Sequence, residues 1–134
     1  MIPDKELQKT FKVLVDEKGT LRLIFLEHVS EPDSNSRVAE LIAKEILKVF
    51  GANPKKKYNV FIDLSLLGKR GYVSSRARKT YVQLAQHKQA NKVAIAGGSI
   101  FLKTITGFIL HAAGKGEKMK WFANKKEAIK WLLK

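Results

Sequence analysis

The sequence contains no cysteine among its 134 residues. Disulfide bonds, thiolate metal sites and cysteine nucleophiles are therefore excluded, and nothing indicates an oxidising compartment. The start MIPDKELQKTF is too polar for a signal peptide, and no apolar run approaches the ~20 residues that span a bilayer. We therefore expect a cytoplasmic protein, with peripheral attachment to a membrane surface as the alternative.

Acidic residues are scarce in the second part of the chain. Residues 1–50 carry nine acids and eight bases, whereas residues 51–134 carry three acids and 18 bases, a net charge of +15. Such a region attracts phosphates, anionic lipid headgroups or acidic proteins. The competing interpretation is that the lysines only keep a small protein soluble.

Patterns typical of catalysis and metal binding are also lacking. His28, His87 and His111 lie far apart without the spacing of metal ligands, and no G-x-S-x-G, paired-carboxylate or triad pattern occurs. Asp63 is the only acid between residues 46 and 116, so it is predicted to accept bonds from a neighbouring loop or to bind a basic partner. We expect a protein that is not an enzyme and has no metal and no cofactor.

Apolar patterning predicts a single α/β domain over residues 1–134. Strand-like runs at 11–15 and 21–26 flank a turn and predict an N-terminal β-hairpin, and runs at 58–64, 92–96 and 118–122 predict further strands, the last at a sheet edge. Helices are predicted around 38–50, 75–89, 99–113 and after Asn124. A helix between two strands forms a crossover that joins parallel strands. We therefore expect a mixed, largely parallel β-sheet with an N-terminal hairpin and about four helices.

Three segments then resemble a known family. In chain order they read FIDLSLLG, SSRARKTYVQLA and NKVAIAGGSIFLKTITGFILHAAGKGEKMKWFANKKEAIKWL. Their order and spacing over residues 11–134 resemble the SpoIIAA-like branch of the STAS domain family. The resemblance implies a single STAS-like domain with the family's α/β sandwich and a regulatory or binding role. The branch also resembles CRAL-TRIO lipid carriers in architecture, with suspected lipid or membrane contacts.

The family includes anti-sigma-factor antagonists that are switched by phosphorylation. Their phosphorylated serine follows an Asp at the start of the helix after the central strand. The matching segment here is GYVSSR, which has the serines but lacks the Asp and continues with Arg76. The resemblance therefore implies Ser74 or Ser75 as the phosphorylation site, and a plain helix cap is the competing role. The pair Asp33-Ser34 precedes an earlier helix and is not equivalent.

Basic residues surround the start of this same helix. Cations there oppose the helix dipole unless an anion is bound, whereas backbone N–H groups and arginines together hold phosphate well. The glycine-rich turn after the strand at 92–96 is predicted at the same carboxyl edge of the sheet. The candidate ligand- or anion-binding residues are Lys69, Arg70, Ser74, Ser75, Arg76, Arg78, Gly97, Gly98 and Ser99.

That turn belongs to the stretch AGGSIFLKT, which differs from a P-loop at one position. A P-loop needs a glycine before its Lys-Thr pair so that the backbone can wrap the phosphates. Leu102 occupies this position, inside an apolar helical pattern that starts at Ser99. We therefore predict an ordinary strand-to-helix turn and no nucleotide hydrolysis.

The helix at 99–113 is apolar on more than one side. A helix that lies on a sheet needs only about a third of its circumference to be apolar. The surplus predicts insertion into a membrane surface, a lipid pocket or a homodimer interface, with burial between neighbouring elements as the competing role. The candidate apolar contacts are Phe101, Leu102, Ile105, Phe108 and Ile109.

These observations predict a non-enzymatic, STAS-like binding or regulatory module. Its partner is expected to be an anionic lipid or membrane surface, a small phosphorylated ligand or a protein. Nucleic-acid binding through the basic half is the alternative, although no helix-turn-helix, RRM or zinc pattern occurs and aromatic residues do not interleave with the basic cluster. A phospho-switched anti-sigma-factor antagonist is a further alternative.

Overall fold

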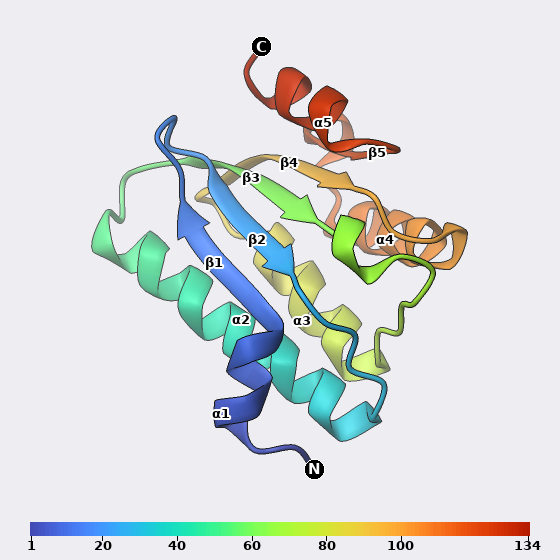
Figure 1. Ribbon diagram of the computed structural model, residues 1–134. Helices are drawn as coiled ribbons and strands as arrows, with labels where there is room; N and C mark the ends of the chain where they lie inside the picture. Colours follow the sequence, from blue (N-terminus) through green and yellow to red (C-terminus); the bar gives the residue numbers. More distant parts are fainter.

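All strands of the computed structural model, which describes residues 1–134, belong to one five-stranded sheet in the order β1-β2-β3-β4-β5 (Figure 1). The first pair is antiparallel and forms the predicted hairpin, and the other three pairs are parallel. The shortest strand, β5, lies at an edge, as predicted. The strands are β1 (Phe11–Val15), β2 (Leu21–Phe25), β3 (Tyr58–Asp63), β4 (Ala90–Ala96) and β5 (Met119–Phe122).

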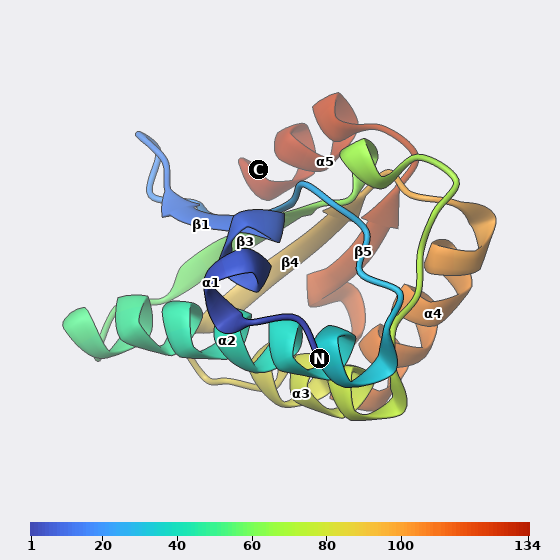
Figure 2. The same cartoon turned by 60° about the horizontal axis from the view of Figure 1, so that its bottom comes forward.

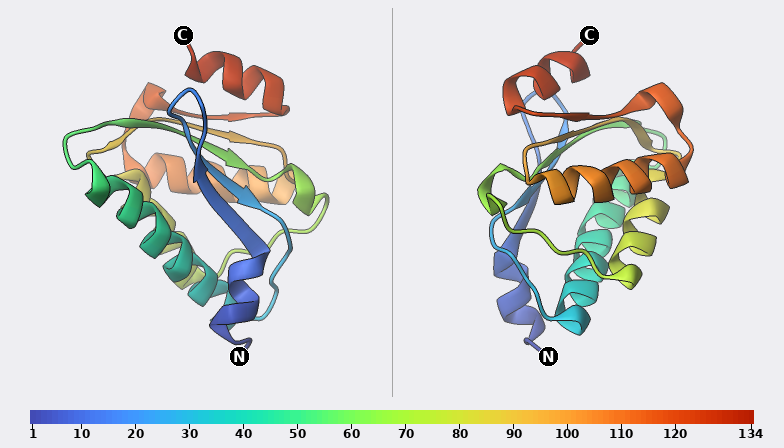
Figure 3. Two further views of the ribbon diagram at one scale, coloured as in Figure 1. Left: turned by 60° about the vertical axis from the view of Figure 1, so that its left-hand side comes forward. Right: turned by 90° about the vertical axis from the view of Figure 1, so that its right-hand side faces the viewer.

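Helices cover both faces of this sheet unequally. The helices α2, α3 and α4 lie on one face, with α2 and α3 side by side (Figure 2), and α5 lies on the opposite face (Figure 3). The predicted mixed α/β architecture is thereby confirmed. The helices are α1 (Asp4–Leu7), α2 (Pro32–Ala52), α3 (Ser75–Ala85), α4 (Ile100–Ala113) and α5 (Lys125–Leu132), with 3₁₀ turns η1 (Gln8–Thr10), η2 (Ser65–Leu67) and η3 (Gly116–Lys118).

The alternation of side chains along the strands separates two hydrophobic cores. In β3, Val60 belongs to the larger core beneath the three helices, whereas its neighbour Phe61 packs with α5 on the other face. Successive strand residues point to opposite faces, so a strand covered on both sides is apolar at nearly every position. This explains why the run YNVFIDL is mostly apolar, and its two polar residues, Asn59 and Asp63, are both bonded to α5.

Several boundaries differ from the prediction. The helix α2 spans Pro32–Ala52 rather than about 38–50, since its polar first turn precedes the apolar pattern. The helix α3 ends at Ala85 rather than near residue 89, and β4 begins at Ala90 rather than at residue 92. The reason is Gln89, whose buried amide nitrogen lies within 3.0 Å of the carbonyl oxygens of Phe50, Asn53 and Lys56. These contacts hold the segment after α3 against the end of α2, so the helix cannot continue.

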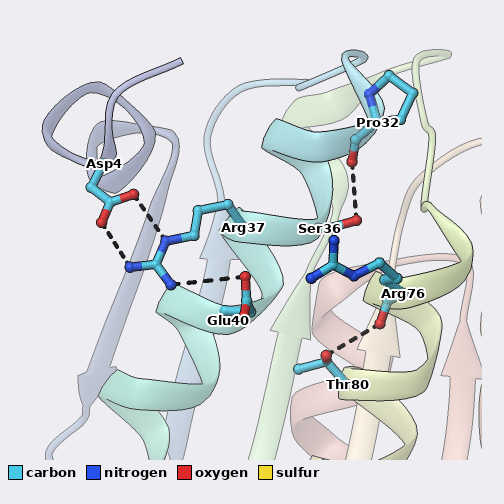
Figure 4. A network of polar contacts seen from close by, with 7 residues as sticks. All are labelled: Asp4, Pro32, Ser36, Arg37, Glu40, Arg76 and Thr80. Carbon is cyan, nitrogen blue, oxygen red and sulfur yellow. Dashed lines mark hydrogen bonds and ion pairs between the residues drawn. The ribbon is translucent and has the colours of Figure 1, made fainter. Parts of the chain in front are cut away.

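The short helix α1 was not predicted, because four residues are too few for an amphipathic pattern. An ion pair fixes it to α2: the Arg37 guanidinium donates to both carboxylate oxygens of Asp4, at 2.9 and 2.8 Å, and also approaches Glu40 (Figure 4). The hydrogen bond from Arg37 lowers the pKa of Asp4. The pair anchors the start of the chain beside β1.

Candidate functional site

The glycine-rich turn after β4 is occupied by the protein's own backbone. Gly97 and Gly98 have φ angles of 83° and 85°, and a Cβ on Gly97 would lie 2.9 Å from the backbone of Ser65. The Trp121 indole donates a hydrogen bond of 3.1 Å to the carbonyl oxygen of Gly97. No phosphate-sized cradle is left between these groups.

The helix that follows starts as the sequence predicted. The Ser99 hydroxyl accepts a hydrogen bond of 3.2 Å from the backbone N–H of Leu102 and caps α4. Lys103 lies in the next turn, with its Nζ 4.7 Å from the centre of the Trp121 ring. It therefore packs along the outside of the helix and is not at the mouth of the turn, unlike the lysine of a P-loop.

Asp63 closes the end of β3. Its Oδ1 accepts hydrogen bonds from the backbone N–H and the hydroxyl of Ser65, at 2.9 and 2.6 Å, and Lys125 lies 3.5 Å from its Oδ2. The expectation that Asp63 accepts bonds from a neighbouring loop is confirmed. Its side chain is buried and paired with a lysine of α5, so it joins the turn to the helix.

Ser74 is a buried helix cap. Its hydroxyl accepts a hydrogen bond of 3.0 Å from the N–H of Ala77 and lies 2.7 Å from the hydroxyl of Ser36 in α2. The residue is 6% exposed. The competing role of Ser74 as a helix cap is confirmed, and the burial of its hydroxyl disfavours modification in this structure, although phosphorylation of Ser74 stays a prediction. Ser75 is exposed, and its phosphorylation stays a prediction.

The basic residues around α3 diverge. Arg76 points toward α2 beside Ser36 (Figure 4), and the Arg78 Nε donates to the carbonyl oxygen of Val73 at 3.2 Å. Lys69 and Arg70 lie in the exposed loop before α3. The Ser74 cap packs on α2, whereas the turn at Gly97 packs on η2. The nine candidate anion-binding residues are therefore not brought together into one site.

The five apolar candidates divide between the two sides of α4. Leu102, Ile105 and Ile109 are 3%, 3% and 9% exposed, so these three cannot touch a membrane surface, contrary to that part of the prediction. These three residues repeat at helical spacing along the inner side of α4 and therefore face the sheet. Phe101 and Phe108 are 53% and 67% exposed. Only these two candidates lie at the surface.

The inner side of α4 lines an apolar cavity of about 100 Å³ between the sheet and the helices α2, α3 and α4. Of the 20 lining residues, Thr106 is the one that is not hydrophobic, and its hydroxyl donates to the carbonyl oxygen of Lys103. Tyr81 forms part of the wall, and burial raises its pKa. A cavity with such walls stays dry and accepts only apolar groups. Contact of Leu102, Ile105 and Ile109 with an apolar ligand stays a prediction.

The outer side of α4 is an exposed apolar face, which we define as Ile100, Phe101 and Phe108 and call the outer face of α4. Ile100 is 85% exposed. In the right-hand view of Figure 3, α4 runs across the side of the molecule that faces the viewer. Gly107 lies on this side with no atom near the place of a Cβ, so it does not mediate a close helix contact.

Comparison with known proteins places the chain in a family. Residues 17–134 match the family described as Domain of unknown function (DUF7793). The chain belongs to this family. A crystal structure of an uncharacterized protein from the DUF3478 family with a SpoIIAA-like fold, from Shewanella loihica PV-4, matches with a TM-score of 0.61 and 19% identity over 91% of each chain. No curated protein matches.

The structural match establishes the fold of this DUF7793 domain and confirms the SpoIIAA-like architecture that the sequence motifs predicted. At this level of identity it concerns the fold alone. None of the helices has both the length and the apolar content needed to cross a membrane. No three His, Asp or Glu side chains gather closely enough to hold a metal ion.

The structure also brings together residues of the DUF7793 domain that the motifs did not single out. Four lysines from three separate connections line a depression of about 320 Å³ near the amino ends of β3, β4 and β5, away from the turn at Gly97. Their only common signal in the sequence is that each lies just outside a helix or strand. The four lysines, which we call the lysine depression, are Lys57, Lys88, Lys115 and Lys118.

Proposed function

We propose that this DUF7793 domain is a non-catalytic module that binds an anionic lipid surface through the outer face of α4. The observation that carries the proposal is the exposure of Ile100, Phe101 and Phe108, at 85%, 53% and 67%, on one side of a single helix. Full burial of each such side chain is worth about 1.5–3 kcal/mol. Covering this face therefore supplies most of the free energy that weak membrane association needs.

The charge around the outer face of α4 favours an anionic partner. The helix carries no acidic residue, and its one cation, Lys103, is exposed and lies over the Trp121 ring of β5. Gly71 packs directly on Leu102, which places the loop with Lys69 and Arg70 next to the start of the helix. Each lysine or arginine near an anionic bilayer contributes about 1 kcal/mol. The cations of this loop therefore lie near the start of the helix that carries the apolar face.

The packing of α4 suits a helix that lies in the plane of the membrane interface. Leu102, Ile105 and Ile109 are buried on its inner side, facing the sheet, so the outer face can enter the headgroup region without unfolding. Interfacial helices have this division between a fixed side and an apolar side flanked by cations. The net charge of +14 adds long-range attraction to the bilayer.

Co-sedimentation with vesicles tests the proposal. We expect binding to vesicles that contain phosphatidylserine, no binding to pure phosphatidylcholine, and a progressive loss of binding as sodium chloride is added. Equal binding to both kinds of vesicle, or binding to neither, contradicts the proposal.

A matched pair of variants locates the contact. The double substitution Phe101→Ser and Phe108→Ser is expected to reduce partitioning to anionic vesicles at least about tenfold, because it removes two buried side chains. The control is Leu47→Ser with Leu133→Ser, which removes two equally exposed apolar residues from α2 and the end of α5. If the wild type instead sediments as a dimer that only the phenylalanine variant dissociates, and no vesicles bind, a second copy covers this face and the proposal fails.

A further inference from the structure

The lysine depression gathers four cations from three connections of the chain. Lys57 precedes β3, Lys88 lies between α3 and β4, Lys115 follows α4, and Lys118 ends η3. Together with Ala90 and Asn91 they form the whole lining of a depression of about 320 Å³. Four of six lining residues are therefore positive and none is acidic.

Lys115 is held in place within the lysine depression. Its Nζ donates to the carbonyl oxygens of His87, at 2.8 Å, and of Ala90. An ammonium group has three N–H donors, so one remains for a ligand. Partial burial lowers the pKa of Lys115, and the positive charges of Lys118 and Lys57 lower it further.

None of the four lysines forms an ion pair, and Glu117, next to Lys118 in η3, forms none either. The five ion pairs of the structure involve Lys9, Arg22, Arg37 and Lys125 and leave the lysine depression out. A cation beyond a helix C-terminus gains from the helix dipole, and Lys115 after α4 does so. That gain does not extend to Lys57, which precedes a strand. A bound anion would therefore stabilise the lysines that have no such partner.

We propose that the lysine depression binds a phosphorylated small molecule that carries at least two negative charges. Four lysines that line one depression supply the charge that a diphosphate or a phosphomonoester needs, and the Lys115 ammonium is fixed by its two carbonyl acceptors. The same phosphate chemistry occurs in soluble metabolites and in lipid headgroups such as that of phosphatidic acid. This site is separate from the outer face of α4 and does not depend on it.

Titration of the full chain with inorganic pyrophosphate tests this site, with calorimetry and amide chemical shifts as readouts at constant ionic strength. We expect saturable binding, with shifts concentrated at Lys57, Lys88, Asn91 and Lys118. The variant Lys57→Gln with Lys118→Gln is expected to bind at least about tenfold more weakly, since it removes two of the four charges. Lys115 is left intact because its ammonium group also supports two backbone carbonyls.

The matched control is Lys44→Gln with Lys48→Gln on the exposed side of α2, which changes the net charge equally. This variant is expected to bind pyrophosphate as the wild type does. No saturable binding, or equal weakening in both double variants, overturns the proposal, because the attraction is then that of a basic surface.

Two further arms distinguish the sources of the phosphate. The first arm uses vesicles that contain phosphatidic acid. If the Lys57/Lys118 variant binds them more weakly than the Lys44/Lys48 variant does, the phosphate that the depression binds is that of a lipid headgroup. Equal vesicle binding together with a selective loss of pyrophosphate binding assigns it to a soluble molecule. The Phe101→Ser with Phe108→Ser variant is expected to keep pyrophosphate affinity, so failure of the membrane proposal and failure of this one are separable.

Discussion

His87 is kept neutral by its surroundings in the fold. Its Nδ1 accepts a hydrogen bond of 3.1 Å from the backbone N–H of Gln89, and its ring centre lies 4.6 Å from that of Phe50. Burial lowers its pKa from the usual value of 6.5, and the charges of Lys88 and Lys115 lower it further. Protonation of Nδ1 would remove the acceptor of this hydrogen bond and add a positive charge near those of Lys88 and Lys115.

The stability of the protein is therefore expected to decrease in mild acid. Because the folded-state pKa lies below 6.5, the unfolded chain binds protons first as the pH falls through this value, which favours unfolding. Urea unfolding of the wild type at about pH 7.5 and about pH 5.5, which bracket the ordinary histidine pKa, measures the decrease. The His87→Gln variant lacks this titration, so its decrease should be smaller. An equal decrease in both proteins contradicts the assignment.

At the scale of single residues, the sequence predicted which residues have a structural role better than it predicted which residues they contact. It identified the pair Ser74-Ser75 as a cap or a phosphorylation site without separating the two. The choice of Ser74 depends on Ser36, 38 positions away, whose hydroxyl lies 2.7 Å from it across the α2–α3 contact. A contact between residues so distant in sequence is set by the packing of the helices and leaves no local pattern.

Among the elements, α4 shows what a local pattern does and does not determine. Ser99 and Gly114 predicted both of its ends, and Gly114 has the left-handed φ of 69° typical of a helix C-terminus. The pattern was apolar almost all round, so it could not say which residues face the sheet. The burial of Leu102 and the exposure of Phe101 depend on the direction in which the chain leaves β4 and enters the helix.

Two glycines associated with α4 are expected to respond to alanine with opposite signs. Gly107 lies in the exposed middle of the helix with no atom within 4 Å of an added Cβ, so Gly107→Ala should stabilise the protein by about 0.5–1 kcal/mol. Gly97→Ala should destabilise it by about 1–2 kcal/mol or more, because φ is +83° and the Ser65 backbone is 2.9 Å away. Urea unfolding measures both. Destabilisation by Gly107→Ala would show that the outer face of α4 is covered, for example by a second copy.

For the molecule as a whole, the sequence predicted the sheet more completely than the binding surfaces. Buried strands such as YNVFIDL and KVAIA are continuous apolar runs, and their alternation with helices limits the topology to a few possibilities. The lysine depression has no such signal. Its members lie between residues 57 and 118 and meet only because the ends of β3, β4 and β5 are adjacent in the finished sheet.

The uneven charge of the chain predicts how stability depends on salt. Residues 51–134 carry a net charge of +15, and only Lys125 among their basic residues forms an ion pair, so repulsion opposes the folded state. Raising sodium chloride from about 0.01 M to about 0.15 M shortens the screening length from about 30 Å to about 8 Å and should raise the free energy of unfolding.

Two double variants test the origin of this gain in stability. The gain should be smaller in Lys57→Gln with Lys118→Gln, which relieves repulsion beside Lys115. It should be unchanged or larger in Lys44→Gln with Lys48→Gln, because Lys44 attracts Asp4. Urea unfolding at both salt concentrations measures these differences, and a wild type that loses stability as chloride is added would contradict the argument.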